Sequence, residues 1–151
     1  MKTMTFLISA AALLLSSVAQ AGTGTIVVKV ENLRNLNQGE LTVALYQKVD
    51  RVELDLAKAY KIKSVPVNQS KLTVSFEALN HGDYAIAILH DMDKDKKMDT
   101  NWLGIPREDL AISNNTKGGP FGGPKWDDAK VSLTGSELVI TPLSMNHMYE
   151  G

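Results

Sequence analysis

Residues 84–89 are apolar at every position, and this stretch limits the possible folds more than any other. A strand without a polar face is usually central in its sheet and covered on both sides. Other stretches alternate apolar and polar residues, most clearly 72–79, which is the period of a strand with one buried face. The sequence therefore predicts sheets that enclose a core, with 84–89 inside one of them.

Short β-rich segments separated by turn residues recur along the chain. They predict an all-β fold, an antiparallel immunoglobulin- or transthyretin-like β-sandwich of about seven strands. We expect the first two segments to pair as a hairpin across the Asn- and Gly-containing turn at 35–39. A short helix is expected within 52–61. The segments lie at 25–33, 40–47, 62–67, 72–79, 84–89, 110–113, 129–134 and 137–143.

Residues 1–21 match the pattern of a secretory signal peptide. Lys2 supplies the positive charge, an apolar stretch follows, and Ala19-Gln20-Ala21 supplies the small residues at the cleavage site. We therefore expect cleavage before Gly22 and a periplasmic or secreted protein. Residues 22–151 are enough for a single domain with its own core.

Composition excludes several classes of protein. The chain has no cysteine, so it can carry neither a lipid-modified cysteine anchor nor a disulfide. Its formal net charge is −1 and no basic run exceeds two residues, which argues against a nucleic-acid partner. After signal cleavage no stretch is apolar for long enough to span a membrane. The expected partner is a protein or a small ligand.

A loop rich in aspartate follows the apolar strand directly. Four aspartates stand at its first, third, fifth and ninth positions, and hard cations such as Ca²⁺ prefer oxygen ligands at such a spacing. The pattern predicts a Ca²⁺ site of the weak affinity found in extracellular modules. The predicted ligands are Asp91, Asp93, Asp95, the backbone carbonyl of Lys97, Asp99 and the side chain of Asn101.

The loop differs from an EF-hand. Lys96 stands where that loop has glycine, Trp102 stands where it has a bidentate glutamate, and the flanking segments have strand character. Three lysines, Lys94, Lys96 and Lys97, also offset the aspartate charges. The alternative is a solvated turn in which Asp and Lys neutralise one another.

Two other sites follow from the residues near the loop. His90 and a loop aspartate could form the active site of a metal-dependent hydrolase. No HExxH motif accompanies them, and this favours a structural role in which His90 hydrogen-bonds the loop. Trp102, Phe121 and Trp126 could instead line a pocket for a small apolar ligand. Aromatic side chains are more often part of the core, which is the alternative for these three.

Several motifs together resemble one protein family. The motifs are Gly-Asp-Tyr-Ala-Ile-Ala-Ile-Leu-His-Asp at 82–91, the aspartate loop, Leu-Gly-Ile-Pro-Arg-Glu at 103–108, Ser-Asn-Asn at 113–115, Gly-Pro at 123–124 and Trp-Asp-Asp-Ala at 126–129. They resemble the DUF2141 family of exported bacterial proteins, and the resemblance implies a β-sandwich without assigning an activity.

A weaker similarity connects the strand and loop with Cna-B-type surface modules, whose loops bind Ca²⁺. The sequence departs from the DUF2141 pattern at Lys94 and Lys96, where the family often has glycine, and at Ala111-Ile112, where an aromatic residue commonly precedes Ser-Asn-Asn. We therefore predict a binding or structural module with a Ca²⁺-stabilised loop. The alternative functions are small-ligand binding in the aromatic pocket and, less favoured, hydrolysis.

Overall fold

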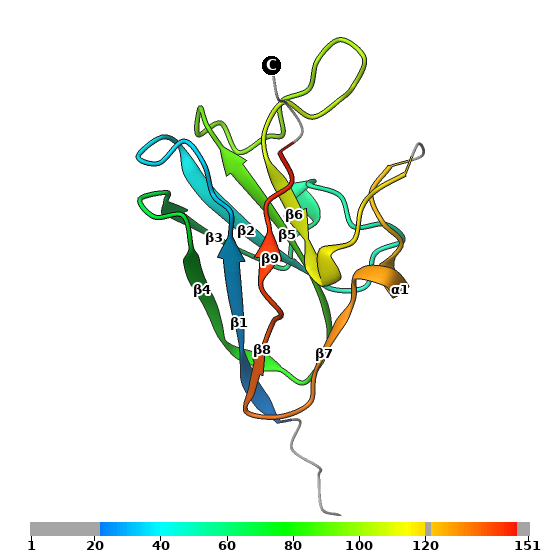
Figure 1. The fold of residues 1–151 in the computed structure, drawn as a ribbon. Helices are drawn as coiled ribbons and strands as arrows, with labels where there is room; N and C mark the ends of the chain where they lie inside the picture. Colours follow the sequence, from blue (N-terminus) through cyan, green and yellow to red (C-terminus); the bar gives the residue numbers. More distant parts are fainter. Residues whose placement is uncertain (1–21, 120–121, 148–151) are drawn as a thin grey trace, which may run out of the picture.

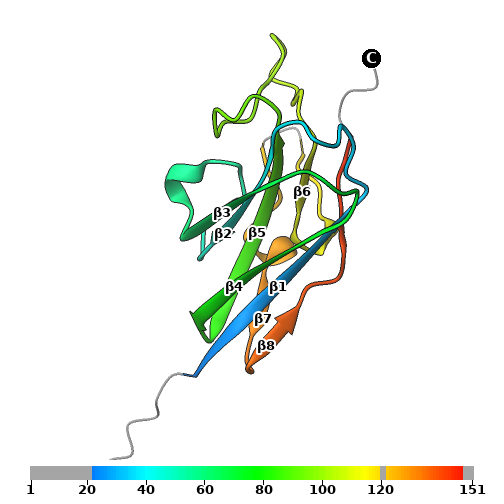
Figure 2. The same cartoon turned by 90° about the vertical axis from the view of Figure 1, so that its left-hand side faces the viewer.

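Two β-sheets face each other in the computed structural model, which describes residues 22–119 and 122–147 (Figures 1 and 2). One sheet contains β1 (Thr23–Glu31), β4 (Leu72–Asn80), β8 (Glu137–Val139) and β9 (Leu143–Ser144). The other contains β2 (Glu40–Tyr46), β3 (Lys61–Pro66), β5 (Gly82–Asp91), β6 (Leu110–Ile112) and β7 (Val131–Leu133). The all-β sandwich is confirmed, with nine strands among the described residues rather than about seven. The predicted signal peptide, residues 1–21, lies outside them.

The helical content is small. A 3-10 turn, η1 (Leu56–Lys58), occupies the segment in which a short helix was expected, and Asp55 caps it by accepting a hydrogen bond from Ala57 N–H. A second turn, η2 (Ser113–Asn115), follows β6, and a single turn of α-helix, α1 (Trp126–Ala129), precedes β7. Within the described residues, no helix has the length and apolar character needed to span a membrane.

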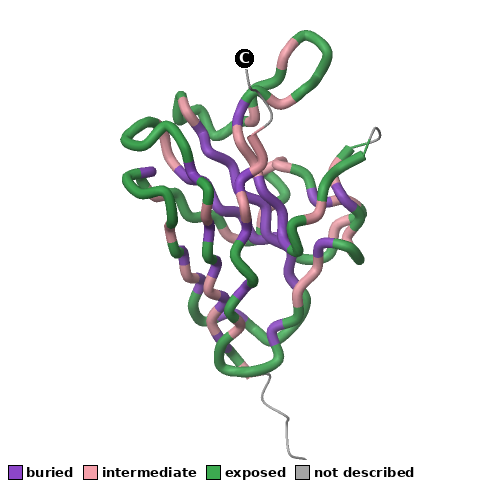
Figure 3. The backbone as a smooth tube through the Cα atoms, viewed as in Figure 1, coloured by how far each residue is buried: buried purple, intermediate pink, exposed green. Residues whose placement is uncertain are grey.

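The main core lies between the sheets, where side chains of β1, β2, β4 and β5 meet, and it appears as the buried interior in Figure 3. Ile86 and Ile88 of β5 point into this core, whereas Ala85 and Ala87 point to the outer face. A second apolar cluster covers that outer face, with Val52 and residues from η1 and α1 packed over it. β5 is therefore covered on both sides, as its sequence predicted.

The predicted hairpin between the first two strands is wrong. β1 pairs antiparallel with β4, and β2 lies in the other sheet between β3 and β5. β2 is buried at six of its seven positions, so it needs cover on both faces and two neighbouring strands. The chain crosses between the sheets through 32–39, where Asn32, Asn35 and Asn37 adopt left-handed backbone conformations.

The first sheet is mixed rather than purely antiparallel. β8 and β9 both run parallel to β1. The reason is the crossing at residues 134–136, which carries the chain from β7 in one sheet to β8 in the other, at the end where β1 also begins (Figure 1). Strands that start at the same end of a sheet and run side by side are parallel.

The Ser-Asn-Asn motif is a joint between chain segments. Ser113 is buried; its hydroxyl donates to the carbonyl of Ala129 and accepts a hydrogen bond from Ile86 N–H. The motif therefore ties β5 to the end of α1. This use of the hydroxyl gives Ser113 a structural role.

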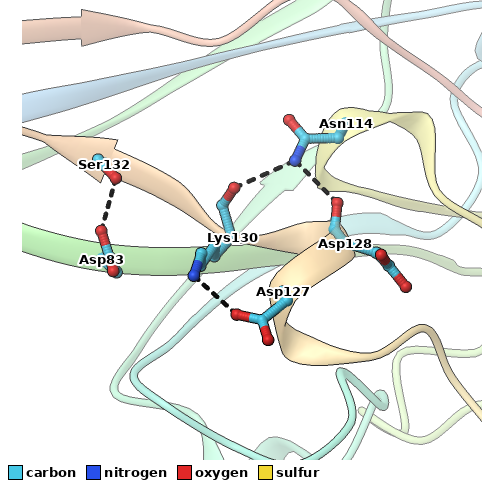
Figure 4. A network of polar contacts seen from close by, with 6 residues as sticks. All are labelled: Asp83, Asn114, Asp127, Asp128, Lys130 and Ser132. Atoms are coloured by element: carbon cyan, nitrogen blue, oxygen red, sulfur yellow. Dashed lines mark hydrogen bonds and ion pairs between the residues drawn. The ribbon is translucent and has the colours of Figure 1, made fainter.

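Asn114 and Asn115 complete the joint. The Asn114 amide donates to the carbonyls of Asp128 and Lys130, at 2.9 and 3.1 Å (Figure 4). Asn115 donates to the carbonyl of Pro142, just before β9. Both asparagines have positive φ, a conformation that Asn tolerates better than most residues. Packing and hydrogen bonding thus give all three residues of the Ser-Asn-Asn motif a structural role.

Candidate metal site in the aspartate loop

β5 carries the chain directly into the aspartate loop, at the upper end of the view in Figure 1. Asp91 is the last residue of the strand and is fully buried, whereas Asp93 and Asp95 are exposed. One carboxylate oxygen from each of the three lies within 4.8 Å of the others. The structure therefore brings together three of the predicted ligands around one point.

The buried carboxylate of Asp91 is only half satisfied. Its Oδ2 accepts a hydrogen bond of 2.8 Å from Lys96 N–H. Its Oδ1 is buried and has no hydrogen-bond partner among the described residues. A buried, unpaired carboxylate oxygen is unfavourable by about 1–3 kcal/mol or more. A cation coordinated at this point would remove that cost.

Hydrogen bonds within the loop fix the other two carboxylates. Asp93 Oδ1 accepts from Asp95 N–H at 3.1 Å, and Asp95 Oδ1 accepts from Lys97 N–H at 2.7 Å. Each of these side chains thus closes a turn two residues long, which is a common use of aspartate. The turns hold both carboxylates close to Asp91.

The loop forms a tight turn without glycine. Lys94 and Lys96 have φ values of 64° and 61°, in the left-handed region that glycine adopts at least cost. These are two of the positions at which the sequence departs from the pattern of the family that it resembles. The lysines therefore leave the shape of the turn intact and make it less stable.

We expect the substitution Lys96→Gly to stabilise the protein by roughly 0.5–1 kcal/mol, because relief of the left-handed strain exceeds the added entropy of the unfolded chain. It should also strengthen cation binding, since a positive charge leaves the loop. Urea denaturation measures the first effect and Ca²⁺ titration the second. Lys97→Gly is the matched control: it removes the same charge without relieving a positive φ, so equal stabilisation by both variants would contradict this account.

Glu108 holds the two ends of the loop together, and sequence reasoning missed this role. Its Oε1 accepts from Met92 N–H at 2.8 Å and its Oε2 accepts from Asp99 N–H at 3.2 Å. Burial raises the pKa of the Glu108 carboxyl, the two backbone hydrogen bonds partly oppose this, and the charges of Asp91 and Asp99 raise it further. The only sequence signal was a charged residue within the Leu-Gly-Ile-Pro-Arg-Glu motif.

The remaining predicted ligands lie differently. The carboxylate of Asp99 does not belong to the group formed by Asp91, Asp93 and Asp95. The backbone N–H of Asp99 instead donates the hydrogen bond to Glu108. The Asn101 side-chain oxygen accepts hydrogen bonds from Leu103 N–H and Ile105 N–H, at 2.9 and 3.0 Å. Asn101 therefore builds the next turn of the chain. The carbonyl of Lys97 stays a prediction.

His90 makes structural contacts beneath the loop. The residue is buried, and its Nε2 lies 2.9 Å from the carbonyl of Gln38. Because a carbonyl only accepts, Nε2 carries the hydrogen and donates it. The His90 N–H donates to the carbonyl of Asp109. These bonds fix His90 between neighbouring segments, and they give it the structural role favoured over a catalytic one.

The three predicted pocket aromatics do not share one environment. Trp102 is 90% exposed, and Trp126 packs against the second apolar cluster. Phe121 lies outside the described residues. A cavity of about 680 Å³ is lined in part by Gly118, Gly119, Gly122 and Gly123, but neither tryptophan lines it.

Comparison with known proteins identifies the family. A family model described as "Uncharacterized protein conserved in bacteria (DUF2141)" matches residues 28–141, which is most of the chain. The chain therefore belongs to the DUF2141 family. No curated protein and no solved structure matches it. The family description assigns no activity.

Proposed function

We propose that this DUF2141 protein is an exported binding or structural module in which a Ca²⁺ ion stabilises the aspartate loop. The buried Oδ1 of Asp91 carries the proposal, because it is a strong oxygen ligand held out of water and has no hydrogen-bond partner among the described residues. Asp93 and Asp95 add two further carboxylates, each with one oxygen within 4.8 Å of an oxygen of Asp91. The signal-like pattern of residues 1–21 supports export.

Ca²⁺ suits this loop better than Mg²⁺ for geometric reasons. Ca²⁺ accepts six to eight oxygen ligands in irregular arrangements, whereas Mg²⁺ requires a near-ideal octahedron. The loop is open to solvent on the side of Asp93 and Asp95, so water can complete the coordination. Lys94 and Lys96 reduce the local negative charge, which favours a dissociation constant of about 10⁻⁴–10⁻³ M, the range of extracellular modules.

The consequence of ion binding would extend to the neighbouring segment. Glu108 links the beginning and end of the loop through Met92 and Asp99, so ordering one end orders the other. The next turn presents Trp102 and Leu103, which are 90% and 60% exposed. An ion in the loop would therefore hold this apolar tip in a fixed position, as a binding module requires.

Thermal melting tests the proposal. With a dissociation constant of about 1 mM, about 10 mM Ca²⁺ should stabilise the protein by about 1.4 kcal/mol and raise Tm by roughly 4–8 °C. EDTA should reverse the shift. The double variant Asp93→Asn/Asp95→Asn should lose it, because two of the converging carboxylates become neutral.

The matched control is Asp50→Asn/Asp128→Asn, which changes the net charge equally at two exposed aspartates outside the loop. This control should keep the full Ca²⁺ shift. A wild-type Tm that does not move with Ca²⁺, or a shift that survives the loop substitutions, would overturn the proposal.

A further inference from the structure

The segment that follows the aspartate loop forms a narrow hairpin, which projects beyond both sheets at the upper end of the views in Figures 1 and 2. Thr100 and Pro106 pair across it, and the N–H of Arg107 donates to the carbonyl of Asp99 at 2.8 Å. The stretch 100–106 between these two charged residues contains no charge. The hairpin is therefore an uncharged projection with one charge of each sign at its base.

The apex of this hairpin, residues 101–105, is apolar and open to solvent, and we call it the hairpin tip. A hydrogen bond of 2.9 Å from Gly104 N–H to the carbonyl of Asn101 closes a turn with Trp102 and Leu103 at its centre. These two side chains are 90% and 60% exposed, and Ile105 is 42% exposed. Large apolar side chains gathered at one exposed point indicate a surface that covers them.

Hydrogen bonds inside the hairpin tip satisfy most of its backbone donors. The side-chain oxygen of Asn101 accepts from Leu103 N–H and Ile105 N–H. Gly104 N–H donates to the carbonyl of Asn101, and Asn101 N–H donates to the carbonyl of Ile105. An unpaired backbone donor is strongly unfavourable in an apolar environment. Because four of its five N–H groups are paired internally, the tip can leave water at little cost.

The charge beside the hairpin tip depends on the ion proposed for the aspartate loop. Residues 91–108 contain five carboxylates and four cationic side chains, so their net charge is −1. A bound Ca²⁺ changes it to +1. Three of the cations are exposed lysines of the loop, and none of them belongs to an ion pair among the described residues. These three are Lys94, Lys96 and Lys97.

An anionic lipid surface fits these features better than a protein does. Trp is enriched where lipid meets water, and exposed lysines bind anionic headgroups. A standard protein interface uses about 20–30 residues on each side. The hairpin tip offers three large apolar side chains on a narrow projection, which is small for such an interface and suits insertion between headgroups.

We propose that the hairpin tip inserts into an anionic lipid surface, with Trp102, Leu103 and Ile105 among the headgroups and the loop lysines in contact with lipid phosphates. Ca²⁺ strengthens this docking, because it reverses the sign of the local charge. The effect of Ca²⁺ rests on the function proposed above, whereas insertion of the tip does not. The protein would then attach to a membrane without spanning it.

Vesicle sedimentation in EDTA tests the docking without any ion. The vesicles contain equal parts of phosphatidylglycerol and phosphatidylcholine, or phosphatidylcholine alone. The Asp93→Asn/Asp95→Asn double variant has the same local charge as the Ca²⁺-bound wild type. It should bind the mixed vesicles at least about tenfold more tightly than wild type does, and phosphatidylcholine no more tightly. The control Asp50→Asn/Asp128→Asn changes the net charge equally outside the loop and should bind as wild type does.

The substitution Trp102→Ala tests insertion, and its high exposure means that folding should be unaffected. In the double variant it should lower the affinity for mixed vesicles about tenfold. It should also abolish the quenching of tryptophan fluorescence by lipids brominated in their acyl chains. Tyr60→Ala is the control, because Tyr60 is an exposed aromatic residue that contacts Tyr84 near the start of β5, whereas the loop follows the end of that strand. It should change neither measurement.

Adding Ca²⁺ separates the docking from ion binding. About 3 mM Ca²⁺ should raise the affinity of wild type for mixed vesicles to that of the double variant, and should leave the double variant unchanged. If wild type ignored Ca²⁺ while the double variant bound in EDTA, insertion would be supported and the role of Ca²⁺ overturned. If Ca²⁺ raised the Tm of wild type but neither protein bound vesicles, the docking proposal alone would fail.

Three further results would overturn insertion of the hairpin tip. The first is equal binding of the double variant to mixed and phosphatidylcholine vesicles. The second is vesicle binding that Trp102→Ala leaves unchanged. The third is a dimer in solution that Trp102→Ala dissociates, which would assign the tip to contact with a second copy of the chain.

Discussion

Replacing Gly39 by alanine is expected to destabilise the protein by roughly 2–5 kcal/mol. Gly39 has φ +66°, which is strained for alanine by about 1–2 kcal/mol. A Cβ at this position would also overlap the carbonyl oxygen of Asp91 and lie 2.7 Å from the Cα of Met92, and backbone atoms cannot turn away from it. Overpacking of this kind adds roughly 1–3 kcal/mol. Urea denaturation measures the total.

Gly104→Ala is the matched control for this effect. Gly104 also has a positive φ, of 77°, but a Cβ there would meet no atom within 4 Å. The control should therefore lose only the conformational part, about 1–2 kcal/mol. Equal losses of stability in both variants would show that the close approach of Gly39 to Asp91 and Met92 does not contribute to the effect.

The substitution Glu108→Ala is expected to cost about 2–4 kcal/mol, because the Met92 and Asp99 N–H groups lose a charged acceptor at the same time. The loop would open at its base, and its affinity for Ca²⁺ should fall with it. Glu77→Ala is the control; Glu77 is exposed on β4, and its loss should change stability by less than about 0.5 kcal/mol.

The pH dependence of this effect follows from the raised pKa of Glu108. A folded-state pKa above the unfolded value means that the folded protein holds the proton more tightly. That stabilising contribution is present below the ordinary pKa of a glutamate and is lost as the pH rises through the raised pKa. In EDTA, the stability difference between wild type and Glu108→Ala should therefore be larger at about pH 4 than at pH 7. A difference that grows with pH would contradict the assignment.

Local pattern was sufficient for the strands and for part of the site. The uninterrupted apolar stretch placed β5 at the centre of a sheet, because no alternation can leave such a strand half exposed. The spacing of Asp91, Asp93 and Asp95 placed three carboxylates together, because alternate residues of a short loop can share one face. Both features depend on residues close in sequence.

Contacts between distant residues could not be predicted in this way. Glu108 meets the loop only because the chain returns after 99–107, and nothing in its local pattern distinguishes it from an exposed glutamate. The pair of His147 and Asp109 likewise joins residues far apart in sequence. The pairing of β1 was predicted wrongly for a related reason. The alternating pattern of β1 is compatible with any neighbouring strand that has one apolar face, and both β2 and β4 have such a face.

Amide NMR during a Ca²⁺ titration tests the central claim most directly. The reporters are the N–H groups of Lys96, which bonds to Asp91, and of Met92 and Asp99, which bond to Glu108. The account predicts that these signals shift and saturate at one site, with a dissociation constant of about 10⁻⁴–10⁻³ M, and that Asp91→Asn abolishes the change. Signals that stay in place up to about 20 mM Ca²⁺, or that saturate equally in Asp91→Asn, would contradict it.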